Sequence, residues 1–278
     1  AGVSFTSTFP TGLSATVFKR RGVDTGERFL AIRGTDGLLD AVNDAIFIVG
    51  AGSTQGSDML AALRAKVSSW LGNGTLPASG FTVTGHSLGG YLAVALTQFE
   101  PAVSKAYLFN TPGEGGLDFG PGAGFLPGWL GKVSDALDLL RQIFPNEKFP
   151  ESLKAKLYNF VARPDGFDPS WAADLGDAYQ HQASVHIENQ GLLVWRHHSI
   201  RWLTESLAVQ DLLSRALEIP GAAPSYADYA RASSDTEALS FERFVNKLAD
   251  LYGTPTISGE DANGFWTSVV ALQNVIVP

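Results

Sequence analysis

The stretch from Phe81 to Tyr91 constrains what this chain can fold into more than any other part of the sequence. Its first four residues are apolar or β-branched and predict a strand, whereas the run that follows Gly90 predicts a helix. Between them lies Gly85-His-Ser-Leu-Gly89, in which glycines stand two positions before and after Ser87. A serine in a strained turn leaves no room for β-carbons at those positions, and Gly90 lets the helix pack close to the strand. The pattern therefore predicts strand, sharp turn and helix, with Ser87 as a nucleophile.

Strands and helices alternate along most of the chain. Further strands are predicted at residues 13–19, 28–32, 105–110, 156–161 and 183–187, and a short buried strand or extended segment at 45–49. Further helices are predicted at residues 58–71, 133–144, 200–217, 240–252 and 264–274, the first of them capped by Ser57-Asp58. The turn-rich residues 22–26 suit a hairpin between the first two strands. This alternation is typical of α/β proteins with a mostly parallel sheet covered by helices on both faces.

Composition excludes several classes of function. The net charge is −8 and there is no run of Lys or Arg, which argues against binding of nucleic acid and against electrostatic docking on anionic membranes. There is no cysteine, so disulfides, thiolate catalysis and cysteine-ligated metals are ruled out. A chain of 278 residues is near the upper limit for one core. We therefore expect a catalytic domain over residues 1–219, with residues 220–278 as a helical extension packed on it.

No export or membrane signal is visible in the sequence. No apolar run approaches the roughly 18 residues that a spanning helix requires, and no positively charged start precedes an apolar stretch. We expect a secreted protein that begins as a mature or excised product of a larger chain, or that leaves the cell without an N-terminal signal.

A serine nucleophile needs a base, and the base needs an acid that holds its tautomer. The histidines are His86, His181, His186, His197 and His198. The first adjoins Ser87 on a tight turn and should point away from it, and the next two lie near a predicted strand. His197 and His198 follow an apolar run at residues 192–195 and precede a helix, which is where a base is expected. We favour His198, with His197 as the alternative.

The acid is expected just past a strand end, between the serine and the base in chain order. Asp165 lies four residues beyond Val161, and Asp168 remains an alternative. The backbone N–H of Leu88 is one expected donor to the oxyanion, and the second is expected in Arg33-Gly-Thr35, where Thr35 offers an N–H and a hydroxyl. The other interpretation of these three residues is an ordinary turn at the end of a strand.

The segment 113–149 differs in composition from the rest of the chain. It is rich in glycine and carries large apolar residues, and its predicted helix is amphipathic. Two interpretations stay open: a lid over an apolar pocket, or an ordinary surface helix between two strands. In the first, the substrate-contacting residues are Phe119, Phe125, Leu126, Trp129 and Leu140.

Together, Ile32-Arg-Gly-Thr35, Asp44, Gly85-His-Ser-Leu-Gly-Gly90 and Asp165 resemble the class 3 (fungal-type) lipase family. The sequence from His198 to Leu207 is also similar to lipase-like domains of secreted bacterial proteins of the RTX type. The resemblance implies an α/β-hydrolase fold with a mobile lid, and a triad of Ser87, Asp165 and His198 that acts on acylglycerols or phospholipids. The lid-like segment follows the nucleophile strand, where the fungal enzymes do not carry theirs, and the calcium repeats of RTX proteins are absent.

The sequence thus predicts a lipase or phospholipase A-type enzyme that works through an acyl-enzyme on Ser87. No metal or organic cofactor is required, although a structural calcium ion would be compatible with the chemistry. The expected partner is a lipid substrate at a micelle or peripheral membrane surface. The alternatives are a non-lipid esterase or peptidase on the same triad, and a catalytically silent binding domain.

Overall fold

The structure is a computed structural model that describes residues 5–8, 13–19, 25–33, 54–111, 113, 149–162, 178–185, 187, 200–216, 240–259 and 262–276. The chain divides into two units. The first comprises residues 1–161 and 171–183, and the second comprises residues 162–170 and 184–278. The boundary expected after residue 219 does not coincide with this division.

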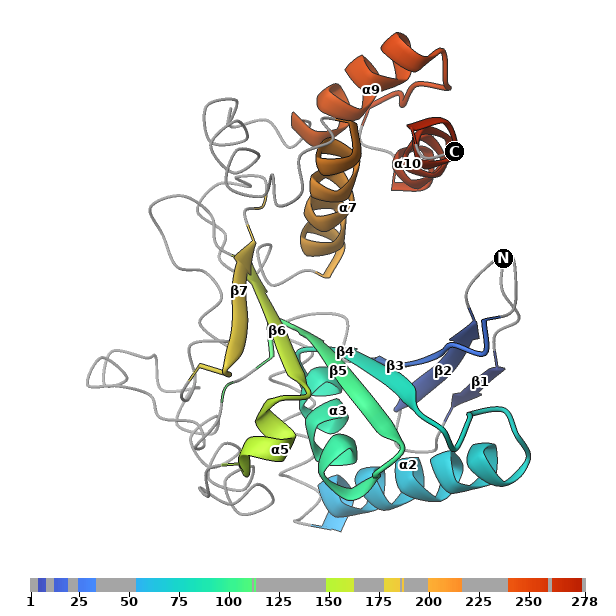
Figure 1. The fold of residues 1–278 in the computed structure, drawn as a ribbon, viewed down its shortest axis with the longest axis vertical. Coiled ribbons are helices and arrows are strands. Elements are labelled where there is room, and N and C mark those ends of the chain that lie inside the picture. The colour runs from blue at the N-terminus through green and yellow to red at the C-terminus, as the bar shows by residue number, and fades with distance from the viewer. Residues whose placement is uncertain are drawn as a thin grey trace. The chain divides into compact units, whose positions relative to one another are not determined.

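A seven-stranded sheet with its strands in chain order organises the first unit (Figure 1). The strands are β1 (Phe5–Thr8), β2 (Ser14–Lys19), β3 (Arg28–Arg33), β4 (Phe81–His86), β5 (Val103–Phe109), β6 (Leu157–Ala162) and β7 (His181–Val185). The pairs β1–β2 and β2–β3 are antiparallel, whereas β3, β4, β5 and β6 run parallel. Ile32 pairs with Gly85 and Phe109 pairs with both His86 and Phe160, so these four strands end at the same edge of the sheet.

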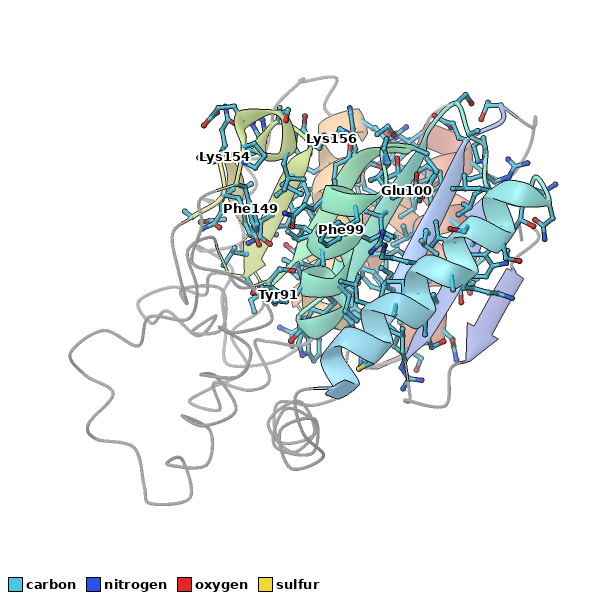
Figure 2. All side chains as sticks on the ribbon, turned by 90° about the horizontal axis from the view of Figure 1, so that it is seen from below. Tyr91, Phe99, Glu100, Phe149, Lys154 and Lys156 are labelled. Carbon is cyan, nitrogen blue, oxygen red and sulfur yellow. The ribbon has the colours of Figure 1, made fainter. Side chains whose placement is uncertain are left out.

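Two helices, α2 (Thr54–Gly72) and α3 (Leu88–Phe99), lie side by side on one face of the sheet (Figures 1 and 2). Alternate strand residues point toward them, because side chains on a strand alternate between the two faces. The core between sheet and helices contains Leu30, Val83 and Leu108 from strands and Leu63, Val67 and Leu96 from helices. All are buried. This core anchors both ends of the β4–α3 turn.

Most predicted elements of the first unit are confirmed, including the hairpin between the first two predicted strands. The predicted start of α2 is wrong, because the helix begins at Thr54, before the proposed cap at Ser57-Asp58. Strand β1 and the short helix α5 (Glu151–Lys154) were not expected, since four residues are too few for a clear period. The strand at 45–49 and the helix at 133–144 lie outside the described residues.

The second unit contains α7 (Ile200–Ala216), α9 (Ser240–Tyr252) and α10 (Ala262–Ile276), all three predicted from periodicity. They enclose a core of their own, which includes Leu212, Phe241, Val245, Phe265 and Leu272. Asn246 ties α9 to the segment before α10, because its side-chain amide donates to the Ile257 carbonyl and accepts the Ile257 N–H. The N–O distances are 2.9 and 2.6 Å.

A mixed sheet whose parallel strands alternate with helices, and whose central strand turns at a serine into a helix, is an α/β-hydrolase fold. The predicted fold class is therefore confirmed. Among the helices described, none is long and apolar enough to cross a membrane.

Candidate active site

Ser87 occupies a strained turn between β4 and α3. Its backbone angles are φ 53° and ψ −122°, and it is one of two non-glycine residues with positive φ in the described part of the chain. Such a conformation costs about 1–3 kcal/mol and persists only where the surroundings impose it. Here the Ser87 N–H donates to the Phe109 carbonyl at 3.0 Å, and the Ser87 carbonyl accepts the Tyr91 N–H at 3.1 Å. The Ser87 hydroxyl makes no capping hydrogen bond to the helix.

Two glycines near Ser87, Gly85 and Gly90, have no room for a β-carbon. A β-carbon on Gly85 would overlap the Gly89 carbonyl and would lie 2.6 Å from the Gly90 nitrogen. A β-carbon on Gly90 would overlap the Thr111 hydroxyl and would lie 3.1 Å from the Gly85 carbonyl oxygen. The crowding expected at Gly85 is therefore present, and Thr111, which follows β5, adds to it at Gly90. The same expectation for Gly89 stays a prediction.

The first turn of α3 offers an oxyanion donor. Leu88 begins the helix directly after Ser87, and the first N–H groups of a helix have no intrahelical acceptor. Thr35, the expected source of the second donor, lies outside the described residues. The strand that precedes it, β3, ends at Arg33 and runs parallel to β4, with Ile32 paired to Gly85.

Asp165 and Asp168, and likewise His186, His197 and His198, lie outside the described residues. The structure does show that β6 ends at Ala162, three residues before Asp165, on the same sheet edge as Ser87. Apart from its two end residues, the segment 113–149 also lies outside the described residues. This part of the chain includes the expected substrate-contacting residues Phe119, Phe125, Leu126, Trp129 and Leu140. One end, Phe149, packs against the core of the first unit.

The other two histidines have different surroundings. His86 follows Thr82 and Thr84 in the alternation of β4 and is half-buried with them, on the opposite face from Gly85. The ring of His181 stacks on that of Tyr158, with centroids 4.7 Å apart. This contact indicates that the His181 ring packs against a neighbouring strand of the sheet.

Sequence reasoning missed a buried polar group at the carboxyl edge of the sheet. Asn110, Thr111 and Asn159 are at most 1% exposed. Asn110 is the second non-glycine residue with positive φ, 46°, and its N–H donates to the Phe160 carbonyl at 2.9 Å. Asparagine tolerates this conformation better than most residues. The position of Asn110 between a strand and Thr111-Pro-Gly113 could therefore have indicated a turn with positive φ at this residue.

Tyr91 lies in the first turn of α3, at the end of the helix nearest Ser87, whereas Phe99 and Glu100 mark the other end (Figure 2). Burial raises the pKa of the Tyr91 hydroxyl well above its usual value. This side chain therefore stays neutral over the working range of pH. Within the described residues, no cluster of three or more His, Asp or Glu side chains could hold a metal ion.

No family model matches the sequence, and a comparison with curated proteins finds no match. Among solved structures, the Francisella virulence factor BioJ is 13% identical to this chain, with a TM-score of 0.33. The match covers 59% of this chain and 65% of BioJ, so this chain spans less than two thirds of the length of BioJ. Carboxyl esterase 2 from the mycorrhizal fungus Tuber melanosporum is 13% identical, with 67% and 76% covered and a TM-score of 0.35. The thioesterase domain from the curacin biosynthetic pathway is 12% identical, with 76% and 98% covered and a TM-score of 0.34. Likeness at this level carries no argument about activity.

Proposed function

We propose that this chain is a serine hydrolase of carboxylic esters and that its substrates are lipids. The observation that carries the proposal is the strained turn at Ser87, between a parallel strand and a helix N-terminus. Strain of about 1–3 kcal/mol at one buried serine is costly unless the serine has a task. Nucleophilic attack by Ser87 would supply this function, because the attack creates an oxyanion that the Leu88 N–H can stabilise.

In the proposed reaction, the Ser87 hydroxyl oxygen attacks the ester carbonyl while His198 takes the hydroxyl proton. Asp165 holds the imidazole in the required tautomer, and the N–H groups of Leu88 and Thr35 bind the oxyanion. The proton then passes to the departing alcohol, and water releases the acyl group from Ser87 by the same route in reverse. No cofactor takes part in these steps.

Lipid substrates are favoured by two features of the sequence. One is the resemblance to class 3 lipases, carried by the serine box and Arg33-Gly-Thr35. The other is the group of large apolar residues in the glycine-rich segment 113–149, which would be costly in water unless they cover an apolar surface.

The nucleophile is tested with Ser87→Ala and, as a matched control, Ser68→Ala, which changes an exposed serine of α2. A fluorophosphonate probe should label the wild type and the control but not Ser87→Ala. Hydrolysis of p-nitrophenyl butyrate should fall by at least about 10³-fold in Ser87→Ala only. Labelling that persists in Ser87→Ala would refute the assignment, and a wild type that neither labels nor turns over would indicate a silent binding domain.

The base and acid are tested in the same assay with two pairs of variants. His198→Ala and Asp165→Asn should each lower kcat by about 10³–10⁴-fold, whereas His197→Ala and Asp168→Asn should leave it within a few fold. The reverse pattern in either pair would move the role to the neighbouring residue.

The substrate class is tested by comparing soluble p-nitrophenyl butyrate with emulsified triglyceride and with micellar phospholipid. A lipid hydrolase should turn over at least one of the aggregated substrates faster above its solubility limit than below it. Activity confined to the soluble ester would identify a non-lipid esterase.

A further inference from the structure

We propose that Asn159 and Thr111 are positioning residues that hold the oxyanion-binding end of α3 in place against Ser87. This inference rests on the proposed function. It concerns two buried residues that belong to different segments of the chain.

The first link runs from β6 to the residue after Asn110. The Thr111 N–H donates to Asn159 Oδ1 at 3.4 Å, and Asn159 Nδ2 donates to the Thr111 carbonyl at 3.0 Å. The same Nδ2 also donates to Gln182 Oε1 on β7 at 3.2 Å. The side-chain amide therefore pairs with the backbone of Thr111 as a neighbouring strand would, and β7 fixes its orientation.

The second link runs from Thr111 to both sides of Ser87. The Thr111 hydroxyl fills the space where a β-carbon of Gly90 would lie, so it packs directly against the first turn of α3. It also donates to the Phe109 carbonyl at 3.4 Å, and that carbonyl accepts the Ser87 N–H at 3.0 Å. A shift of Thr111 would therefore disturb the backbone both before and after the nucleophile.

Such a shift should affect the transition state more than substrate binding. An oxyanion donor acts at about 2.7–3.1 Å from the developing charge, and a displacement of about 1 Å can cost about 10²-fold in rate. The ground-state ester carbonyl interacts weakly with the same donor. Loss of the Asn159–Thr111 pairing should therefore lower kcat and leave KM nearly unchanged.

The experiment compares Asn159→Leu with Asn246→Leu. Asn246 is a matched control because it makes the same two-point pairing, with the Ile257 backbone, within the second unit. Both variants are assayed on p-nitrophenyl butyrate, with kcat referred to active sites titrated by a fluorophosphonate. Asn159→Leu should lose about 10- to 100-fold in kcat with KM within about threefold, whereas Asn246→Leu should retain the wild-type kcat per active site.

A second readout separates oxyanion stabilisation from a general loss of structure. A thionoester develops its charge on sulfur, which is larger and accepts hydrogen bonds more weakly than oxygen. Asn159→Leu should therefore lower the ester rate more than the thionoester rate, so that their ratio falls. In Asn246→Leu this ratio should equal that of the wild type.

If Asn159→Leu does not fold, Thr111→Ala serves in its place, because it removes the hydroxyl that packs on Gly90 and donates to the Phe109 carbonyl, and leaves the amide pairing with the Thr111 backbone intact. A wild-type kcat in these variants, or equal losses on ester and thionoester, would overturn the positioning role. Failure of the proposed function would look different, because the wild type itself would then not label at Ser87.

Discussion

At the residue scale, the two glycines near Ser87 are constrained by different partners. A β-carbon added at Gly85 would overlap backbone atoms, whereas a β-carbon added at Gly90 would overlap the Thr111 side chain. Backbone in a tight turn cannot give way without loss of the turn. A side chain can be shortened by substitution, so only the constraint at Gly90 should be relievable, and only in part, because the Thr111 β-carbon and the Gly85 carbonyl oxygen would still lie 3.0 and 3.1 Å away.

We therefore expect Gly90→Ala to lower the free energy of unfolding, although alanine is favoured over glycine in a helix by about 1 kcal/mol. Overpacking against Thr111 costs about 1–3 kcal/mol and outweighs that gain. The double variant Gly90→Ala/Thr111→Ala should be more stable than the sum of the single changes predicts, whereas Gly85→Ala/Thr111→Ala should show no such coupling. Urea titrations of the five variants measure these differences, and a stabilised Gly90→Ala would contradict the packing described here.

The same residues show which contacts could be predicted. The turn at Ser87 was predictable because its backbone contacts between glycines join residues at most five positions apart. The pairing of Asn159 with Thr111 spans 48 positions and depends on the register of β5 against β6, which no local pattern determines. Positioning residues of this kind are therefore found only when the sheet is known.

At the element scale, one helix offers a matched pair of ion pairs. In α7, Arg201 Nε lies 2.8 Å from Glu205 Oε1, and Arg215 Nε lies 2.8 Å from Asp211 Oδ1, both at i,i+4 spacing. The Glu205 side chain is fully buried and the carboxylate of Glu242, from α9, is 3.9 Å from Arg201. The Asp211 side chain is 38% exposed. The spacing and the N–O distance are thus the same in both pairs while burial differs, and the order of acid and base along the helix is reversed.

Arg201→Met should destabilise the protein by about 2–4 kcal/mol, because it removes the guanidinium from a buried carboxylate. This expected loss of stability is at the lower end of the range for a broken buried ion pair, because the Arg201 side chain is itself 31% exposed. Arg215→Met should cost at most about 1 kcal/mol, as is usual for an exposed pair. Urea unfolding followed by far-UV circular dichroism compares the two, and equal losses would show that burial does not decide their strength.

Sequence periodicity predicted these helices well, because each buries an apolar stripe against neighbours. The predicted and observed bounds of α9 agree at both ends. The start of α2 was wrong because a cap of Ser or Asp is a local preference that helix packing can override. Periodicity did not predict which helices share a core, because an apolar helix face does not indicate which element packs against it.

At the scale of the whole molecule, the described residues form two separate cores. One joins β2–β6 to α2 and α3, and the other joins α7, α9 and α10. The division of the chain places α7 with the two C-terminal helices. Each core has buried leucines in its helices, among them Leu63 of α2 and Leu212 of α7, both 0% exposed.

We expect this division to govern local stability. Leu63→Ala and Leu212→Ala remove equal volumes from fully buried helical sites and should each cost about 2–5 kcal/mol. Because neither residue belongs to the other core, each loss should stay within its own unit. Hydrogen exchange followed by mass spectrometry should show faster exchange in α2, α3 and β3–β5 for Leu63→Ala, and in α7, α9 and α10 for Leu212→Ala. Exchange that rises in parallel throughout the molecule in both variants would instead show one cooperative domain, in which stability at the Ser87 turn depends on the C-terminal helices as much as on its own sheet.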